Sequence, residues 1–422
     1  DMDYTFSDDT PITVDASANT GGVDLNFTHS EKVTFIGSQA NDRLSLSVED
    51  SDIDQGPSID DDQEVVIEGG VGDNYYNIET DDKLTITNAD GNNNYEIDAN
   101  TASVTAGNGN NFLQGYAAHL TAAFGDGDNR IDLELDDGND EAVTGLETTE
   151  TGANITLGDG ANHVTITTSD DLASLDDGSG GYSAFVGSGG SGGFATENAG
   201  GAIFGDSIDM PEINITAGDG GNTIRLPQLP VGLDGSSSVM ALTKINVTTG
   251  DGDDTILAAG AEITISSGGG DDEITLLGVS NDVVTEFAQL SGDTDWTPAS
   301  GGYNGLSLAE DGTFLYNGFA ASTFGAKIDI DTGPGSATIN LGAFNDSLGE
   351  VSGNIVADEG SSITGEDITL FVNTHADLRA ASLDGITRII MDDDSSLFAG
   401  LGSIGDGGES EQDTAGEPGG DV

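Results

Sequence analysis

The sequence predicts an all-β chain folded as a parallel β-solenoid, a β-helix or β-roll with about 18 residues per coil and with loop or hairpin insertions. Three observations predict it. Glycine-centred nonapeptides return at 18-residue intervals, short alternating runs of Ile, Val and Thr separate them, and the 64 glycines fall at fixed offsets rather than in tracts. Without this order, a chain with 77 acidic residues, nine basic residues and 6 % aromatics would fit the composition of a disordered protein.

The glycine motif has the pattern x-G-x-G-x-[Asn/Asp] and recurs along most of the chain. The copies that start at residues 88, 106 and 124 are 18 residues apart, as are the copies at 249 and 267. Other copies start at residues 69, 157 and 217, with a degenerate copy at 332 and a poorer one at 36. The wider gaps between them indicate coils that carry insertions.

The other half of each unit is a short stretch such as KLTIT, NITL or EITIS. Eighteen residues suit two short strands and two tight turns, and the strands of successive coils would pair in parallel about 4.8 Å apart. Each coil then buries its Ile, Val and Leu against the equivalent residues of the next coil. Glycine is expected in the turns because the same positions repeatedly need a positive φ. We therefore expect an elongated molecule.

Insertions divide the expected coils into three groups. The predicted boundaries are coils over 1–167, a Gly/Ser-rich insertion over 168–212, coils with the strongest motifs over 213–280, a second insertion over 281–325, coils over 326–401 and an acidic, Gly-rich tail over 402–422. Phe185, Phe194 and Phe204 favour a first insertion that packs on the solenoid or against another subunit. In the second insertion, Asp311-Gly312 between two alternating runs predicts a β-hairpin.

The formal net charge of −68 restricts the partners of this chain. Nucleic acids and anionic membranes would be repelled, and the basic residues are scattered singly rather than gathered in a patch. Cations are the natural counterpart, and an acidic, lysine-poor surface suits a saline, halophilic or marine setting in which counterions screen self-repulsion. No apolar run is long enough to cross a membrane.

The chain has no cysteine, so no disulfide stabilises the fold. It starts at Asp1 rather than Met, which leads us to expect a processed, secreted product located outside the cell or at its surface. The N-x-[Ser/Thr] sequence marks candidate glycosylation sites. They are Asn26, Asn154, Asn214, Asn246 and Asn345.

The repeat resembles the haemolysin-type, or RTX, calcium-binding nonapeptide of secreted bacterial proteins, a family that includes toxins, proteases, adhesins and surface-layer proteins. The resemblance implies a parallel β-roll with calcium between adjacent turns, bound by carbonyl groups of the glycine turn and by the carboxylate of the sixth residue. That residue is Asp254 in one copy and Asp272 in the next. Only one half of each coil carries the motif here, so calcium would line one edge.

In most copies the sixth residue is asparagine, which is neutral. A stack of asparagines reads equally well as a ladder of side-chain amides that hydrogen-bond from coil to coil without metal. The residues concerned are Asn41, Asn74, Asn93, Asn111, Asn129, Asn162 and Asn222.

Asp254 and Asp272 favour a metal instead. Two carboxylates held one coil apart repel each other by several kcal/mol at an effective dielectric constant of about 20, and a bound divalent cation removes that repulsion. Hard oxygen ligands suit Ca²⁺ better than a transition metal. Supporting ligand candidates are Asp251, Asp253, Asp271, Asp126, Asp128, Asp159 and Asp219. The alternative for each of these is a solvated turn aspartate that bonds its own backbone.

The sequence contains no signature motif of an enzyme, and we expect that this protein is not an enzyme. His29, His119, His163 and His375 lie far apart in the sequence, without a metal-binding or nucleophile motif beside them. Paired carboxylates are abundant, so a carbohydrate-active β-helix enzyme remains an alternative, as does an adhesin stalk. The prediction is a secreted, calcium-stabilised structural protein that assembles with copies of itself into a surface layer, extracellular matrix or filament, with cell-surface polysaccharide as a further candidate partner.

Overall fold

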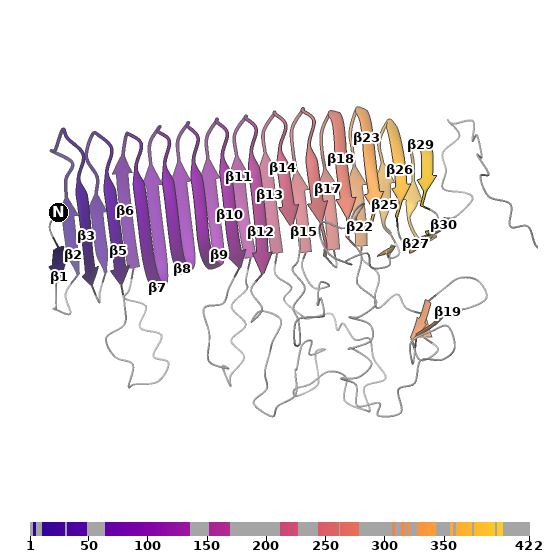
Figure 1. Ribbon diagram of the computed structural model, residues 1–422, viewed down its shortest axis with the longest axis horizontal. Coiled ribbons are helices and arrows are strands. Elements are labelled where there is room, and N and C mark those ends of the chain that lie inside the picture. Colours follow the sequence, from indigo (N-terminus) through magenta and orange to yellow (C-terminus); the bar gives the residue numbers. More distant parts are fainter. Residues whose placement is uncertain are drawn as a thin grey trace, which may run out of the picture.

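The computed structural model describes residues 3–5, 11–29, 32–48, 64–135, 152–168, 212–226, 244–260, 262–277, 306–308, 314–316, 319–320, 327–342, 355–357, 360–373, 375–392 and 395–399. Every regular element among them is a β-strand, and 24 strands belong to one continuous parallel arrangement. The described part contains no helix that is long and apolar enough to cross a lipid bilayer. The predicted parallel β-solenoid is confirmed, and Figure 1 shows its coils stacked along the long axis.

Each coil contributes one strand to each of two faces. Face A consists of β1 (Asp3–Thr5), β3 (Asp24–His29), β5 (Arg43–Val48), β10 (Arg130–Leu135), β12 (His163–Thr168), β14 (Thr223–Leu226), β16 (Thr255–Ala258), β18 (Gly270–Leu276), β23 (Gly335–Leu341), β26 (Asp367–Val372) and β29 (Ile386–Met391). Face B consists of β2 (Ile12–Asp15), β4 (Val33–Ile36), β6 (Glu64–Gly70), β11 (Gly152–Leu157), β13 (Glu212–Ala217), β15 (Lys244–Thr248), β17 (Glu262–Ser266), β22 (Lys327–Asp331), β25 (Ser362–Thr364) and β28 (Ser382–Leu383). Three long strands run through both faces, namely β7 (Tyr75–Asn88), β8 (Asn94–Ala106) and β9 (Phe112–Phe124).

The core lies between the two faces and is built from every second residue of each strand. On face A, Ile131, Val164 and Ile224 stand in register on successive coils, and all three are fully buried. The alternation of buried and exposed side chains follows from the two-residue period of a strand. Because each buried side chain rests on its equivalent in the next coil, the repeat in the sequence becomes a set of apolar columns along the solenoid axis.

The two long edges of the solenoid differ. At one edge, which we call the glycine edge, short turns containing the nonapeptide motif lead from face B to face A, and they form the regular row at the top of Figure 1. At the other edge the chain passes from face A to face B. The insertions begin at this second edge, since residues 136–151, 169–211 and 278–305 each follow a face A strand.

The insertions do not divide the solenoid. Glu262 of β17 pairs with Lys327 of β22, and Gly270 of β18 pairs with Gly335 of β23, so the coils on both sides of the second insertion are direct neighbours. The predicted hairpin is confirmed, because β19 (Leu306–Leu308) pairs antiparallel with β20 (Phe314–Tyr316), which pairs with β21 (Phe319–Ala320). The predicted contacts of Phe185, Phe194 and Phe204 and the acidic tail lie outside the described residues.

The last coils gain a third strand, which the sequence did not predict. A short parallel sheet contains β24 (Ile355–Val356), β27 (His375–Leu378) and β30 (Ser396–Ala399). Each of these strands follows a face A strand in the chain, so the coil becomes three-sided at its C-terminal end. Ala376 and Leu378 of β27 are fully buried against the core.

Candidate metal site

The glycine edge is so tightly stacked that the glycines at two motif positions leave no room for a Cβ. At the fourth position, Gly127 has a φ of 141°, and a Cβ there would lie 2.3 Å from the carbonyl oxygen of Gly109 on the preceding coil. At the second position, a Cβ on Gly158 would lie 2.5 Å from Oδ1 of Asp126. The glycine at the fourth position is required by backbone conformation and stacking. A Cβ at the second position of this copy would meet backbone as well as a side chain, since Asp126 N and the Gly125 carbonyl carbon lie 2.7 Å away.

The sixth residues of the motif form a column inside the glycine edge, which we call the buried row. It contains Asp42, Asn74, Asn93, Asn111, Asn129, Asn162, Asn222, Asp254 and Asp272, and each of them is buried. The hydrogen bonds repeat from coil to coil. Asn111 donates both its backbone N–H (3.1 Å) and its Nδ2 (3.0 Å) to Oδ1 of Asn129, and Nδ2 also donates to the Gly109 carbonyl (3.0 Å). The coil-to-coil hydrogen bonds of the predicted asparagine ladder are thus present.

The first copy of the motif corrects the predicted register. Asn41 was expected in the column, but Asp42 occupies it, and its N–H donates to Oδ1 of Asn74 (2.9 Å). The reason is a turn of six residues between Ile36 and Arg43, where the turn between Ala106 and Phe112 has five. The extra residue moves Asn41 outward, where its Oδ1 accepts the N–H of Asp73 (2.9 Å).

Asp254 breaks the pattern of hydrogen bonds in the buried row. Its Oδ1 accepts the N–H (2.8 Å) and the Nδ2 (2.9 Å) of Asn222, as an asparagine oxygen would. Its Oδ2 stands where an asparagine would carry its donor nitrogen, and this oxygen is buried with no hydrogen-bond partner. Asn222 uses that nitrogen to bond the carbonyls of Gly218 (3.1 Å) and Gly220 (2.9 Å). The equivalent groups near Oδ2 of Asp254 are the carbonyls of Gly250 and Gly252. A carbonyl accepts hydrogen bonds and cannot donate one to a carboxylate oxygen.

Asp272, on the next coil, is better satisfied. Its Oδ1 accepts the N–H of Asp254 (3.1 Å), and its Oδ2 accepts the hydroxyl of Ser267 (2.6 Å). Ser38 bonds Asp42 in the same way (2.6 Å). The equivalent hydroxyl beside Asp254 belongs to Thr249, which donates to the Ser267 carbonyl (3.1 Å). The row ends at the following coil, where Ala337 is in register with Asp272.

Burial governs the electrostatics of this pair. Asp254 and Asp272 are 1 % and 3 % exposed, and burial raises the pKa of each carboxyl above its ordinary value. The proximity of Asp272 raises the pKa of Asp254 further, and the exposed Asp253 and Asp271 do the same for Asp272. The Thr249 hydroxyl and the donors of Asn222 act in the opposite direction and lower the pKa of Asp254, although Oδ2 itself has no hydrogen-bond partner.

The donor set fits a hard cation in its chemistry, because every group in question is an oxygen: two carboxylates, the glycine carbonyls of the turn and the Thr249 hydroxyl. No group of three or more His, Asp or Glu side chains close enough to hold a metal ion occurs in the described ranges. A cation at Asp254 would thus depend on backbone carbonyls for part of its coordination. A proton on Oδ2 is the alternative, since a protonated carboxyl can donate as an asparagine does.

The other predicted ligands lie on the outer surface of the glycine edge, in two columns. The outer row, at the third motif position, contains Asp90, Asn108, Asp126, Asp159, Asp219 and Asp251. The middle row, at the fifth position, includes Asp73, Asn92, Asn110, Asp128, Asp253 and Asp271. The structure thus separates the nine candidates into three columns, and it places only Asp254 and Asp272 in the interior.

Aspartates of the outer row bond across coils rather than within their own turn. Oδ1 of Asp126 accepts the N–H of Asp159 (3.2 Å), Oδ1 of Asp159 accepts that of Asp219 (3.0 Å), and Oδ1 of Asp219 accepts that of Asp251 (2.9 Å). Every one of these side chains is exposed. In the outer row the side chain of the earlier coil accepts the hydrogen bond from the later coil. In the buried row the direction is reversed, because the side chain of the later coil accepts from the earlier coil.

Three glycosylation candidates also form a column, on face B. Asn154, Asn214 and Asn246 are in register on successive coils, and their side-chain amides bond each other at 2.8 Å and 2.7 Å. These bonds give the repeated asparagine a structural role on the strand surface. Asn26 is exposed on β3, and Asn345 lies outside the described residues.

The four histidines do not meet. His29 lies on β3, His119 on β9, His163 on β12 and His375 on β27. Burial, together with the neighbouring Arg130, lowers the pKa of His163, so this ring is neutral near pH 7. No histidine side chain in the described part of the chain belongs to a group of three or more potential metal ligands.

Comparisons with known proteins found no matching family model, no matching curated protein and no matching solved structure.

Proposed function

We propose that this protein is a secreted structural subunit whose solenoid assembles with copies of itself, end to end, into a filament, matrix or surface layer stabilised by calcium. The observation that carries the proposal is that the terminal strands of the described stack have a pairing partner on one side only. Within the described residues, β2 pairs only with β4 at one end, and β29 pairs only with β26 at the other. A strand edge with unpaired N–H and C=O groups is a template for another strand.

The C-terminal end is suited to such pairing. Ile389 and Met391 of β29 are 38 % and 48 % exposed, although the equivalent residues of earlier coils are covered by the next coil. At the N-terminal end, Ile12 and Val14 of β2 are only partly buried. Stacking one end on the other continues both faces in parallel and leaves the next end open, so the assembly is a fibre rather than a closed ring.

Calcium has two roles in this proposal. It supplies the positive charge that the Asp254 and Asp272 pair lacks, and it reduces the self-repulsion of a chain with a net charge of −68. The second role includes the exposed carboxylates of the outer and middle rows. Both roles make stability and assembly dependent on divalent cations.

Electron microscopy of the purified protein with calcium and with EGTA tests the proposal. Ordered fibres or sheets that form with calcium and disperse with EGTA support it. Monodisperse particles under both conditions contradict it, and release of reducing sugar from polysaccharides by such particles would favour the carbohydrate-active alternative.

A further inference from the structure

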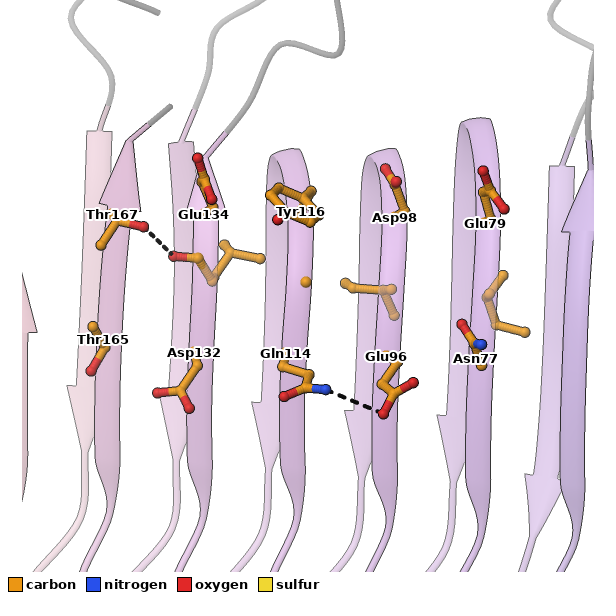
Figure 2. Close-up of a pocket in the computed structure, with 14 residues that line it drawn as sticks. Asn77, Glu79, Glu96, Asp98, Gln114, Tyr116, Asp132, Glu134, Thr165 and Thr167 are labelled. Atoms are coloured by element: carbon orange, nitrogen blue, oxygen red, sulfur yellow. Dashed lines mark hydrogen bonds between the residues drawn. The ribbon is translucent and has the colours of Figure 1, made fainter. Parts of the chain in front are cut away.

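A groove runs along the outer surface of face A, across β7, β8, β9, β10 and β12. Its volume is about 670 Å³. Figure 2 shows that it lies between two columns of polar side chains, with the strand backbones as its floor. One column consists of Asn77, Glu96, Gln114, Asp132 and Thr165, and the other of Glu79, Asp98, Tyr116, Glu134 and Thr167. None of the candidate metal ligands of the glycine edge lines the groove, so the groove is a separate candidate site.

Gly115 shapes the floor of the groove. It stands in register with Ile97 on one side and Leu133 on the other, in a column that is otherwise made of core side chains. Gly115 has a φ of 136°, and a Cβ there would lie 1.8 Å from the Ile97 carbonyl oxygen. Glycine inside a strand marks a place of close backbone approach, and here it interrupts an aliphatic column at the centre of the groove.

The dimensions select an extended, narrow ligand. The two columns come from residues i and i+2 of the same strands, so they are about 6.6 Å apart at 3.3 Å per residue. An α-helix, about 10 Å across with its side chains, is too wide to enter. The five strands extend the groove over about 19 Å along the solenoid axis at 4.8 Å per coil.

The first column contains both hydrogen-bond donors and hydrogen-bond acceptors. Gln114 donates to Glu96 (3.2 Å), which also accepts the Tyr75 hydroxyl (2.7 Å), and Asp132 is bound by Arg130 (2.6 Å). Arg130 therefore partly neutralises Asp132, and the neutral Gln114 and Tyr75 hold Glu96 in a fixed orientation. Amides and hydroxyls stand between them, so the column presents donors and acceptors in alternation, which suits ligand hydroxyls better than a row of cations.

Tyr116 supplies an aromatic surface at the centre of the second column. It is 46 % exposed, and in the described part of the chain it is the only large aromatic side chain that is exposed to this extent. In register beside it stand Asp98 and Glu134, as Figure 2 shows. An amphipathic ring of this kind packs against the weakly positive C–H groups of a ligand and keeps a hydroxyl for hydrogen bonding.

We propose that this groove binds a polysaccharide chain without acidic groups, laid along the solenoid axis with a sugar ring on Tyr116. The hydroxyls of the sugars bond the carboxylate and amide columns, and the negative charge of Glu79, Asp98 and Glu134 excludes uronic acids and sulfated sugars. This binding does not depend on the proposed assembly, because the groove lies within one chain and away from the solenoid ends.

Isothermal titration calorimetry of the full chain with hexasaccharides tests the proposal, using cellohexaose, chitohexaose and mannohexaose as neutral probes and hexagalacturonate as the acidic probe. We expect at least one neutral probe to bind with little salt dependence, and the acidic probe not to bind. Tyr116→Ala should weaken that binding at least tenfold. Val71→Ala is the matched control, because Val71 is similarly exposed (43 %) but lies at the glycine edge, and it should bind as the wild type does.

Three results would overturn the proposal: no binding of any neutral hexasaccharide, unchanged binding by Tyr116→Ala, or equal loss in Val71→Ala. Melting curves of both variants show whether the fold is retained, and the exposure of both side chains makes that the expected result. If Tyr116→Ala nevertheless lost stability, Gln114→Ala offers a second variant that should also weaken binding, since the half-buried Gln114 bonds Glu96 on the outer surface of face A. Filaments that form while saccharide binding fails would reject the groove alone, and the reverse result would reject the assembly alone.

Discussion

Asn222 donates its backbone N–H and its side-chain amide to one oxygen of Asp254, at 2.8 Å and 2.9 Å, while the second oxygen of that carboxylate is buried without a partner. The same column satisfies every asparagine through its nitrogen. At this one coil an oxygen takes the place of the amide nitrogen, which leaves a buried oxygen without a hydrogen-bond partner. A bound cation, or a proton on the carboxylate, would satisfy it. Stability should reveal this defect more directly than any other property.

Asp254→Asn should raise the free energy of unfolding in calcium-free buffer near pH 7. The new amide can donate to the Gly250 and Gly252 carbonyls as Asn222 does to Gly218 and Gly220, which removes a buried unsatisfied oxygen. The expected gain is about 1–3 kcal/mol. Denaturant unfolding of the two proteins in EGTA measures this gain. A variant less stable than the wild type under these conditions would contradict the claim that Asp254 carries an unsatisfied buried oxygen.

The reciprocal change, Asn129→Asp, should destabilise the protein. Nδ2 of Asn129 donates to the Gly125 and Gly127 carbonyls, both at 3.0 Å, and to Asn162 at 3.1 Å. Loss of this donor leaves buried acceptors unpaired at a cost of about 1–3 kcal/mol. The same unfolding measurement applies, and Asn154→Asp on the exposed surface of face B serves as the control with a small effect.

The pH dependence should differ between the wild type and the Asp254→Asn/Asp272→Asn double variant. The folded state raises the pKa of both carboxyls, so it binds their protons more tightly than the unfolded chain, whose Asp pKa is about 3.9. Without calcium, the wild type should therefore gain stability relative to the double variant as the pH falls from 7 towards 4, and lose it again as the pH rises. Thermal melting at several pH values in EGTA checks the sign. A wild type that loses stability relative to the double variant on acidification would refute it.

Gly127→Ala should disrupt the stacking of the glycine edge. The alanine would have to adopt a φ of 141° and place its Cβ 2.3 Å from the Gly109 carbonyl oxygen. We expect a loss of about 2 kcal/mol or more from strain and displacement. Gly21→Ala is the control, because a Cβ there meets only Asn19 Oδ1 at 3.8 Å. Equal melting temperatures for the two variants would argue against tight stacking.

Ile389→Lys/Met391→Lys should prevent end-to-end assembly without unfolding the solenoid. Both side chains are exposed at the terminal strand β29, so the charges do not enter the core, but they would be buried in a stacked pair of ends. Sedimentation with calcium should show only single particles for this variant. Val71→Lys places a lysine on the lateral edge and should assemble as the wild type does. Filaments from the β29 variant would exclude this end as the contact.

The fold was predictable because glycine spacing and strand alternation are properties of single coils, and each coil repeats the same solution. The asparagine ladder was predictable for the same reason. The position of Asp42 was not, because one extra residue in its turn changes which side chain points inward. The hydroxyl partner of Asp272 could have been found in the sequence, since Ser267 lies five residues before it and hydrophobic residues such as Ala106 precede most ladder asparagines at that distance.

The groove left only a weak signal. Gly115 interrupts the alternating run FLQGYAA, but a single glycine in a strand has many explanations. Its meaning depends on which residues lie beside it on neighbouring coils, and insertions of variable length between coils hide that register in the sequence. The three-sided C-terminal coils were missed likewise, because β24 contains two residues and β27 and β30 contain four each, which is too short to be recognised.

Thermal melting of the wild type and of Asp254→Asn/Asp272→Asn at pH 7.5, each with calcium chloride and with EGTA, tests most directly whether the buried carboxylate pair requires a divalent cation. We predict that calcium raises the melting temperature of the wild type, leaves that of the double variant nearly unchanged, and that in EGTA the double variant is the more stable protein. An equal calcium effect on both proteins, or no effect on the wild type, would contradict the assignment.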